Sequence, residues 1–324
     1  MRAAVVVCLG MLSSAHSLAS PPQPPIRSVV TFGDSWSDAG TFGTIYGTTP
    51  GSSWSQLLAR RYGDDQTPYM FVSAGKAQIL GGLNYAQGGA KTATPAKEGD
   101  PEDSLPNSAA AQIEHHKKVF GRFRPRQLIV LWIGTNDILA PFTKGDGRSE
   151  KDAQIMNSAE SVPQSMSEAA TATIHQAVVD QVKLIGVLLT NGAARLVVMN
   201  CPDMGWATFQ PGTTRAGLER ASELTALFND LLAKAIPRDP RVLLVDANSI
   251  LRRAANPASG FTHVPTDACA NDSVVCGPTE YRERGADESY MFAGYGHLTR
   301  HARQLLASSV GELIDKQWSP GSAN

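Results

Sequence analysis

The sequence predicts an α/β fold of three layers, in which helices cover both faces of one doubly wound, mostly parallel sheet. Short, nearly continuous apolar runs rich in Val, Ile and Leu recur along the chain, and such runs are typical of parallel strands that are buried on both faces. Longer segments with apolar residues at helical spacing lie between these runs, as the crossovers of a parallel sheet require.

Predicted strands and helices alternate along most of the chain. A sheet of about five strands is expected from the apolar runs at residues 28–33, 83–86, 127–133, 195–200 and 241–246. Helices are expected at residues 54–60, 108–120, 160–190, 215–235 and 299–316. Stretches rich in Gly, Pro and Asp are expected to be loops that shape a substrate crevice, at residues 94–107, 143–152 and 255–287.

The composition indicates one globular domain. With 324 residues and an apolar content of 42%, the chain can bury a large single core. Its net charge of −1 gives no basic excess that would indicate a nucleic-acid partner. We therefore expect one domain over residues 28–318 and a short tail at 319–324, and the sequence does not indicate an oligomeric state.

The first 19 residues have the pattern of a secretory signal peptide. Arg2 precedes a short apolar stretch, and Ser17-Leu18-Ala19 fits a small-x-small cleavage site. The apolar stretch is too short to span a bilayer, and the Pro-rich residues 20–27 that follow are typical of a linker. We therefore expect a secreted protein, extracellular or periplasmic, without stable insertion into a membrane.

Two of the four cysteines are expected to form a disulfide. Cys269 and Cys276 have six residues between them in a segment rich in Gly, Pro, Asp and Asn, and in an exported protein this pattern indicates a bond that clamps a loop. Cys201 follows an apolar run and is expected to be a buried free thiol. A catalytic thiol is the alternative, but Ser35 already fills the role of a nucleophile.

Polar residues with reactive or hydrogen-bonding side chains follow the predicted strands. Ser35 follows the first strand in a Gly-Asp-Ser turn, and Asn136 follows the strand at 127–133. Ligands of open α/β sheets bind in the crevice beyond the carboxyl ends of the strands, so we expect both side chains there. A pair of glycines that includes Gly89 can expose a backbone N–H toward the same crevice, and His297 lies just before the last helix.

Acyl transfer would give these residues complementary roles. Ser35 would attack a carbonyl carbon, and His297 would take the hydroxyl proton as a general base. The oxyanion would be stabilised by the Ser35 N–H, the Gly89 N–H and the Asn136 side chain, with each donor contributing roughly 3 to 4 kcal/mol.

These segments together resemble the GDSL, or SGNH, hydrolases. The Ser, Gly, Asn and His that name the family match Ser35, Gly89, Asn136 and His297. The resemblance rests on Phe32-Gly33-Asp34-Ser35, on Asn84 to Ala90, on Gly134-Thr135-Asn136-Asp137, on His297-Leu298-Thr299, and on Asn200 to Gly205, which is similar to a motif of secreted and autotransporter-type members. It implies a flavodoxin-like three-layer fold and esterase, lipase, thioesterase or acyltransferase activity without a metal.

Two positions depart from the family pattern. Ser35 is followed by Trp36 where Leu is usual, and Trp36 would either contact bulky acyl groups or pack into the core. The residue three before His297 is Gly294, where the family usually has the Asp of the triad. A backbone carbonyl, Asp287 or Glu288 could take its place, or a Ser–His dyad could operate alone. Tyr295 is a further candidate for contact with the substrate.

The sequence therefore predicts a secreted serine esterase or lipase that acts on small-molecule or lipid esters without a cofactor. An acyltransferase on the same scaffold is one alternative, and an impaired ligand-binding homologue is another because of Gly294. No histidine has a Cys or carboxylate at metal-ligand spacing, so no metal site is expected. His115 and His116 are expected on a solvated helix face.

Overall fold

The structure, a computed structural model, describes residues 24–94, 104–145, 148–206, 212–271 and 273–318. The predicted signal peptide, the first part of the Pro-rich linker and the predicted tail lie outside these residues. Described secondary structure begins with a strand at Ser28 and ends with a helix at Trp318. The division into one domain with a leader and a tail stays a prediction.

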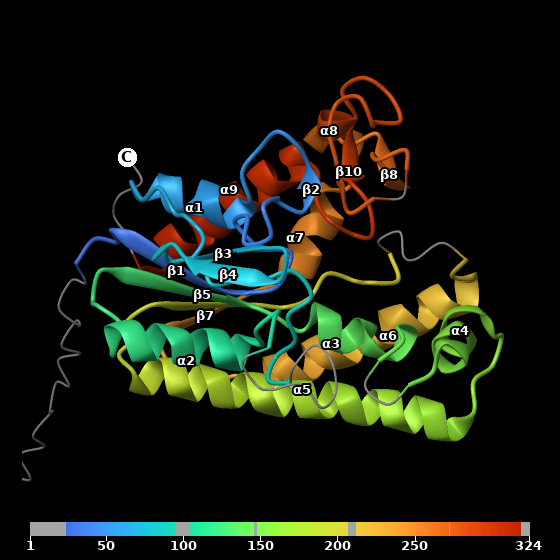
Figure 1. Cartoon of the computed structure of the whole chain (residues 1–324), viewed down its shortest axis with the longest axis horizontal. Coiled ribbons are helices and arrows are strands. Elements are labelled where there is room, and N and C mark those ends of the chain that lie inside the picture. Colours follow the sequence, from blue (N-terminus) through green and yellow to red (C-terminus); the bar gives the residue numbers. More distant parts are fainter. Residues whose placement is uncertain (1–23, 95–103, 146–147, 207–211, 272, 319–324) are drawn as a thin grey trace, which may run out of the picture.

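A parallel sheet of four strands forms the centre of the molecule (Figure 1). The strands are β1 (Ser28–Gly33), β5 (Gln127–Trp132), β6 (Leu196–Met199) and β7 (Val242–Val245), in the spatial order β1-β5-β6-β7. The chain at Asn84 adds one parallel bridge to Thr31 of β1, so a fifth segment lines this edge. The resulting order is the 2-1-3-4-5 order of flavodoxin-like sheets, which confirms the predicted fold.

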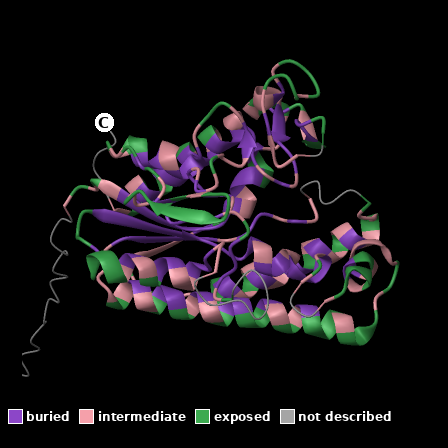
Figure 2. Cartoon of the chain, viewed as in Figure 1, coloured by how far each residue is buried: buried purple, intermediate pink, exposed green. Residues whose placement is uncertain are grey.

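Helices cover both faces of the sheet and bury alternate residues of its strands (Figures 1 and 2). Val30, Phe32 and Ile129 belong to the core cluster shared with α2 (Ala109–Phe120), α5 (Gln164–Thr190) and α6 (Arg215–Ala235). Val29, Leu128 and Val130 belong to the cluster shared with α1 (Trp54–Arg61), α7 (Ala247–Ala254) and α9 (Arg300–Trp318). Each such buried aliphatic side chain contributes about 1.5 to 3 kcal/mol.

Two of the predicted loops contain regular structure. α4 (Glu150–Ser158) begins inside the stretch 143–152, where Ser149 and Asp152 form a capping box that starts a helix in a polar sequence. The stretch 255–287 contains short elements instead of one long loop. These are η2 (Pro257–Ser259), β8 (His263–Asp267), β9 (Val275–Cys276) and the start of α8 (Ala286–Ser289). β8 pairs with β10 (Tyr290–Phe292), and β9 pairs with β2 (Gly47–Thr48).

Other short elements were not predicted. The strands β3 (Met70–Ser73) and β4 (Lys76–Ile79) form an antiparallel hairpin, and both strands are too short to give a periodic signal. The helices α7, α3 (Thr135–Leu139) and η1 (Ala140–Phe142) were also not predicted.

The expectation of a solvated face for His116 is wrong. Its side chain is buried, its ring stacks on Phe123 at 4.5 Å between centroids, and its Nδ1 lies 3.2 Å from the Tyr85 hydroxyl. Burial lowers the pKa of His116 to about 4, so this imidazole is neutral at physiological pH. It is a core residue because α2 turns this position toward Phe32 and not toward water.

α5 is the one helix in the described part of the chain whose length and apolar composition would suit a membrane span. Its buried residues Ile174, Ile185 and Leu188 belong to the core cluster that also holds residues of α6 and the sheet. Core packing therefore accounts for the apolar composition of α5.

The cysteines behave as the sequence predicts. Cys269 and Cys276 form a disulfide, and Cys201 is a buried free thiol. Burial raises the pKa of the Cys201 thiol, which disfavours the reactive thiolate. The disulfide closes a small loop that packs on Ala293, close to the last predicted site residue, His297.

Candidate active site

Ser35 is presented by a tight turn at the end of β1. A Cβ atom at Gly33 would lie 2.3 Å from the carbonyl oxygen of Trp132, so only glycine allows β1 to approach β5 this closely. The Gln112 side chain of α2 accepts a hydrogen bond from the Gly33 N–H and donates one to the Gly33 carbonyl, each at 2.9 Å. Gln112 thereby fixes the point at which the strand stops and the turn begins.

Two buried carboxyl groups, those of Asp34 and Asp38, hold the backbone around Ser35. Oδ1 of Asp34 accepts a hydrogen bond from the Trp36 N–H at 3.0 Å. Oδ1 of Asp38 accepts from the N–H groups of Gly40 and Thr41, and its Oδ2 accepts from Gly88 at 3.0 Å. Asp38 therefore links the Ser35 turn to the glycine pair of the next loop.

His297 meets Ser35 directly, although 262 positions separate them in the sequence. Nε2 of His297 lies 2.8 Å from Oγ of Ser35, and Nδ1 lies 3.1 Å from the carbonyl oxygen of Gly294. A carbonyl oxygen can only accept a hydrogen bond, so Nδ1 carries the proton and Nε2 offers its lone pair to Ser35. This tautomer is the one that a general base at Nε2 requires.

The disulfide loop explains why residue 294 is a glycine. A Cβ atom at Gly294 would lie 2.0 Å from the carbonyl oxygen of Ser273, which belongs to the loop closed by the disulfide. The same loop donates a hydrogen bond from the Cys269 N–H to the carbonyl of Ala293 at 2.8 Å. The turn that carries His297 is thus packed too closely against this loop to hold any side chain at position 294.

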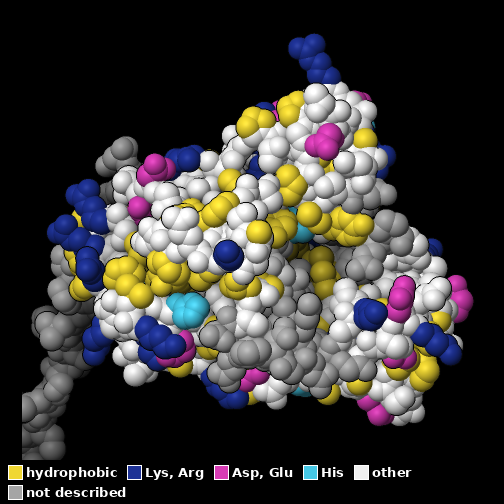
Figure 3. Space-filling model, in the orientation of Figure 1, with side chains coloured by type: hydrophobic (Ala, Val, Ile, Leu, Met, Phe, Trp, Pro, Cys, Tyr) yellow, Lys and Arg dark blue, Asp and Glu magenta, His cyan; other side chains and the backbone are white. Residues whose placement is uncertain are grey.

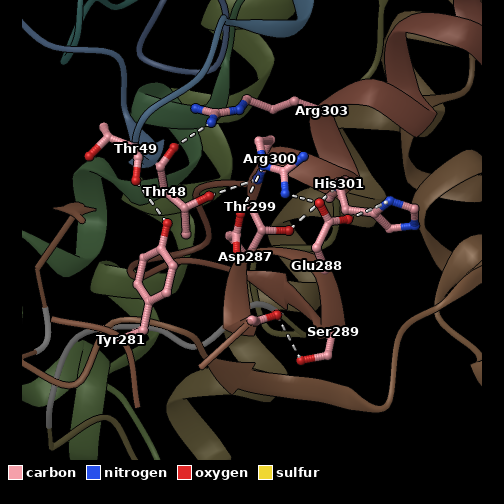
Figure 4. Close-up of polar contacts among 12 residues, drawn as sticks. Thr48, Thr49, Tyr281, Asp287, Glu288, Ser289, Thr299, Arg300, His301 and Arg303 are labelled. Atoms are coloured by element: carbon pink, nitrogen blue, oxygen red, sulfur yellow. Dashed lines mark hydrogen bonds and ion pairs between the residues drawn. The ribbon is translucent and has the colours of Figure 1, made fainter. Parts of the chain in front are cut away.

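Asp287 and Glu288 do not take the place of the triad Asp. Asp287 accepts a hydrogen bond from Nε of Arg300 at 2.8 Å, and Glu288 pairs with Arg300 and with His301 (Figure 4). Both carboxylates lie on α8, and their contacts with Arg300 and His301 hold them against the start of α9. Among the alternatives left open by the sequence, the backbone carbonyl is the group that lies against Nδ1 of His297.

Three groups near Ser35 could donate hydrogen bonds to a bound oxygen. Nδ2 of Asn136 donates one of its two hydrogens to the carbonyl of Ala90 at 2.8 Å, which places Asn136 of α3 against the glycine loop. Gly89 adopts φ +84°, a backbone conformation that suits glycine. Within the described residues, the backbone N–H groups of Ser35 and Gly89 donate to no acceptor.

Trp36 lies in the core. It is 6% exposed, and its ring lies 5.1 Å from that of Trp132 and 6.2 Å from the imidazole of His297. The structure thus favours packing over contact with the acyl group for Trp36. Tyr295 is half-buried with φ +49°, next to the His297 turn, and its role in substrate contact stays a proposal.

Tyr46 is a site residue that the sequence did not reveal. Its ring stacks on the imidazole of His297 with 5.3 Å between centroids, and its hydroxyl occupies the space where a Cβ of Gly88 would lie. Tyr46 lies in a Gly- and Thr-rich segment without periodicity, so only the fold brings it to the site. It shields the imidazole from water on one ring face.

Burial sets the protonation states around the nucleophile. It lowers the pKa of His297 to about 4, which keeps the imidazole neutral and able to accept a proton at neutral pH. It raises the pKa of Asp34 to about 8, because within the described residues Oδ2 of Asp34 is buried without a hydrogen-bond partner and Asp137 lies nearby. Asp34 is therefore largely neutral at pH 7 and serves the turn as a hydrogen-bond acceptor.

Comparison with known proteins gives a family match across most of the chain. The model of the family described as GDSL-like lipase/acylhydrolase matches residues 29–310. A curated relative, a phosphatidylcholine-sterol acyltransferase of Aeromonas hydrophila, is 24% identical over 325 aligned positions, which cover 94% of this chain and 84% of that protein.

Two solved structures are similar at low identity. An extracellular lipase of Streptomyces rimosus is 15% identical with a TM-score of 0.47, and the match covers 86% of this chain and 98% of that one. A phospholipase A1 of Streptomyces albidoflavus is 15% identical with a TM-score of 0.43, and the match covers 89% and 98%.

The first prediction concerns Gly294. Replacing Gly294 with Asp, which would supply the residue usual in the family, is expected to lower both stability and activity, because the new Cβ would meet the backbone of Ser273. Overpacking of this kind costs about 1 to 3 kcal/mol. Thermal unfolding and ester hydrolysis measure the effect. Gly186→Ala is the control, since a Cβ there meets nothing within 4 Å. A Gly294→Asp enzyme that is faster and equally stable contradicts the prediction.

The second prediction concerns pH. A histidine acts as a base only when neutral, and the pKa of His297 is lowered to about 4, so hydrolysis should persist as the pH falls to about 5 and be lost through about 4. The acid limb of kcat/KM for a soluble ester measures this pKa. Re-assay at neutral pH after acid exposure separates titration from unfolding. An acid limb with an apparent pKa near 6.5, the ordinary pKa of histidine, would show that the imidazole is not desolvated.

Proposed function

Because this chain belongs to the GDSL-like lipase/acylhydrolase family, we propose that it is a secreted serine hydrolase of carboxylic esters, with Ser35 and His297 as its catalytic pair. Membership of the family supports an ester-hydrolysing activity. The observation that supports these two residues is the 2.8 Å contact between Oγ of Ser35 and Nε2 of His297. An impaired binding protein would not require this contact.

The reaction would proceed in two steps. Ser35 attacks the ester carbonyl while Nε2 of His297 takes the hydroxyl proton, and His297 then returns that proton to the departing alcohol. Nε2 of His297 then takes a proton from water as the water attacks the acyl-enzyme, and it returns this proton to Oγ of Ser35 as the bond to the acyl group breaks and the acid leaves. The N–H groups of Ser35 and Gly89 and the second hydrogen of the Asn136 amide would stabilise the oxyanion in both steps.

The carbonyl of Gly294 would perform one of the two functions of a triad carboxylate, which is to fix the tautomer of the histidine. In serine proteases, loss of the triad Asp lowers kcat by about 10⁴ through the wrong histidine tautomer, with the geometry intact. The Gly294 carbonyl enforces the correct tautomer, because it can only accept the Nδ1 proton. It carries no full negative charge, so it stabilises the imidazolium less than a carboxylate would.

Export is supported by two features that lie far apart in the chain. The disulfide between Cys269 and Cys276 is of the kind that persists in oxidising compartments. Residues 1–19 have the composition of a signal peptide. We infer that the mature protein works outside the cytoplasm.

An acyltransferase activity is the second candidate. It is favoured by the curated relative, whose name describes transfer of an acyl group from phosphatidylcholine to a sterol. Such an enzyme would form the same acyl-enzyme on Ser35, but an alcohol would accept the acyl group instead of water. Analysis of the products formed from phosphatidylcholine with and without added cholesterol distinguishes the two: a sterol ester indicates transfer, and free fatty acid alone indicates hydrolysis.

The third prediction tests the catalytic pair. Ser35→Ala should lower kcat for a p-nitrophenyl ester by at least about 10³-fold, because the nucleophile is removed while the fold remains. Asn136→Ala should lower kcat by about 10²- to 10³-fold through the loss of one oxyanion donor. Steady-state kinetics on variants with unchanged circular dichroism measure both.

Cys201→Ala is the matched control, since it removes the other candidate nucleophile and should leave most activity. A fluorophosphonate probe should label the wild-type protein at Ser35 and fail to label Ser35→Ala. Retention of hydrolysis by Ser35→Ala, or labelling at another residue, would refute the assignment.

A further inference from the structure

A hollow of about 620 Å³ lies at the end of the sheet opposite to Ser35. Its lining includes Ser28 and Gln127, which begin β1 and β5, whereas Ser35 follows the carboxyl end of β1. Six residues of extended strand separate the two ends by about 20 Å. The hollow is therefore distinct from the candidate active site.

Four arginines, Arg27, Arg122, Arg124 and Arg126, are among the residues that line this hollow, which we call the arginine pocket. All four residues are exposed, and within the described ranges no carboxylate forms an ion pair with any of them. Because the whole chain has a net charge of only −1, this concentration of unpaired positive charge is a local feature. Arginine forks are suited to bidentate recognition of phosphate oxygens.

A fifth arginine lies behind the pocket wall. Arg195 is 2% exposed, and its guanidinium donates to the carbonyl oxygens of Pro24 and Pro125, two lining residues. Its Nε is buried and, among the described residues, has no hydrogen-bond partner. A buried cation that is bonded to carbonyl oxygens keeps its full positive charge, so Arg195 adds to the positive potential at the pocket.

Exposed apolar side chains lie on the segments that supply Phe120 and Leu83 to the lining of the arginine pocket. Val119 and Phe120 at the end of α2 are 55% and 39% exposed, and Ile79 and Leu80 at the end of the β3–β4 hairpin are 58% and 50% exposed. In Figure 3 a yellow patch lies beside dark-blue side chains at the left edge, which is the end where β1 and β5 begin in Figure 1. Exposed apolar groups that gather beside cations are typical of surfaces that bind a lipid interface.

We propose that the arginine pocket binds the anionic phosphate headgroup of a lipid at a membrane surface, while Val119, Phe120, Ile79 and Leu80 enter the interface around it. The charge complementarity selects an anionic headgroup, and the exposed apolar side chains select a lipid surface over a soluble anion. The pocket would hold the protein on the surface and leave the Ser35 crevice at the other end free. This binding is independent of the proposed hydrolysis.

The test is vesicle cosedimentation of the mature protein in the Ser35→Ala background, which keeps the vesicle lipids intact. Vesicles of phosphatidylcholine alone are compared with equal mixtures of phosphatidylcholine and phosphatidylglycerol. The protein should bind the mixed vesicles at least about tenfold more strongly, and rising salt should weaken this preference. The triple variant Arg122→Gln/Arg124→Gln/Arg126→Gln should lose at least about tenfold in binding.

A matched triple variant controls for net charge. Lys151→Gln/Arg253→Gln/Arg284→Gln removes three exposed cations away from the pocket and should bind as the parent does. Ile79→Ser/Leu80→Ser alters only exposed side chains and should weaken binding to the mixed vesicles at high salt, where the apolar contribution dominates. In the Ser35-containing protein, all three variants should hydrolyse a soluble short-chain ester at the parent rate, which separates this proposal from the proposed function.

Three results would overturn the proposal. The first is equal binding to both kinds of vesicle, and the second is equal loss of binding in the two triple variants. The third is saturable binding of inorganic phosphate, measured by calorimetry, without any binding to vesicles, because it would identify a site for a soluble anion.

Discussion

The hydrogen bond from Nδ1 of His297 to the carbonyl of Gly294 is the constraint on which the candidate site depends. It fixes the ring orientation and the tautomer, and so it decides whether Nε2 can accept a proton from Ser35. A carboxylate usually provides this contact in Ser–His–Asp systems. Here the acceptor is the carbonyl of Gly294, three residues before the histidine in the same turn. This carbonyl also accepts a hydrogen bond from the His297 backbone N–H at 3.0 Å.

The turn is held from outside by a loop that has no part in the chemistry. The segment between Cys269 and Cys276 bonds to Ala293 and fills the space over Gly294, so its disulfide limits the freedom of the His297 turn. A disulfide that closes a short loop contributes about 2 to 3 kcal/mol, chiefly through the unfolded chain in the entropic model. Formation of the Cys269–Cys276 disulfide and the position of His297 are therefore coupled, because the loop packs directly on the turn that carries His297.

Much of the fold could be predicted from the sequence because the buried strands carry unbroken apolar runs. β1, β5, β6 and β7 lie where those runs predict them, and the long helices follow the helical spacing of Leu, Ile and Val. Two of the short elements were missed for a physical reason: the β3–β4 hairpin contains too few residues to show a period, and α4 is defined by its capping box in a polar stretch. α7 was missed although its buried residues Ala247, Ile250, Leu251 and Ala254 have helical spacing.

Site residues that follow a strand could be predicted from the sequence. Site residues that are brought into place only by tertiary packing could not. Ser35 and Asn136 could be placed because Ser35 lies two residues after the end of β1 and Asn136 lies four residues after the end of β5. Tyr46 and the role of the Gly294 carbonyl could not, because a stacked ring and a backbone acceptor leave no pattern in the chain. Asp287 and Glu288 lie at a plausible distance from His297 in the sequence, but in the fold both pair with the guanidinium of Arg300.

The protonation state of the His297 ring nitrogens is the most direct measurement of this arrangement. Long-range ¹H–¹⁵N correlation spectra of the protein at neutral pH should show a neutral imidazole that is protonated at Nδ1 and unprotonated at Nε2. A proton on Nε2, or an imidazolium at neutral pH, would contradict a base that is oriented by a backbone carbonyl.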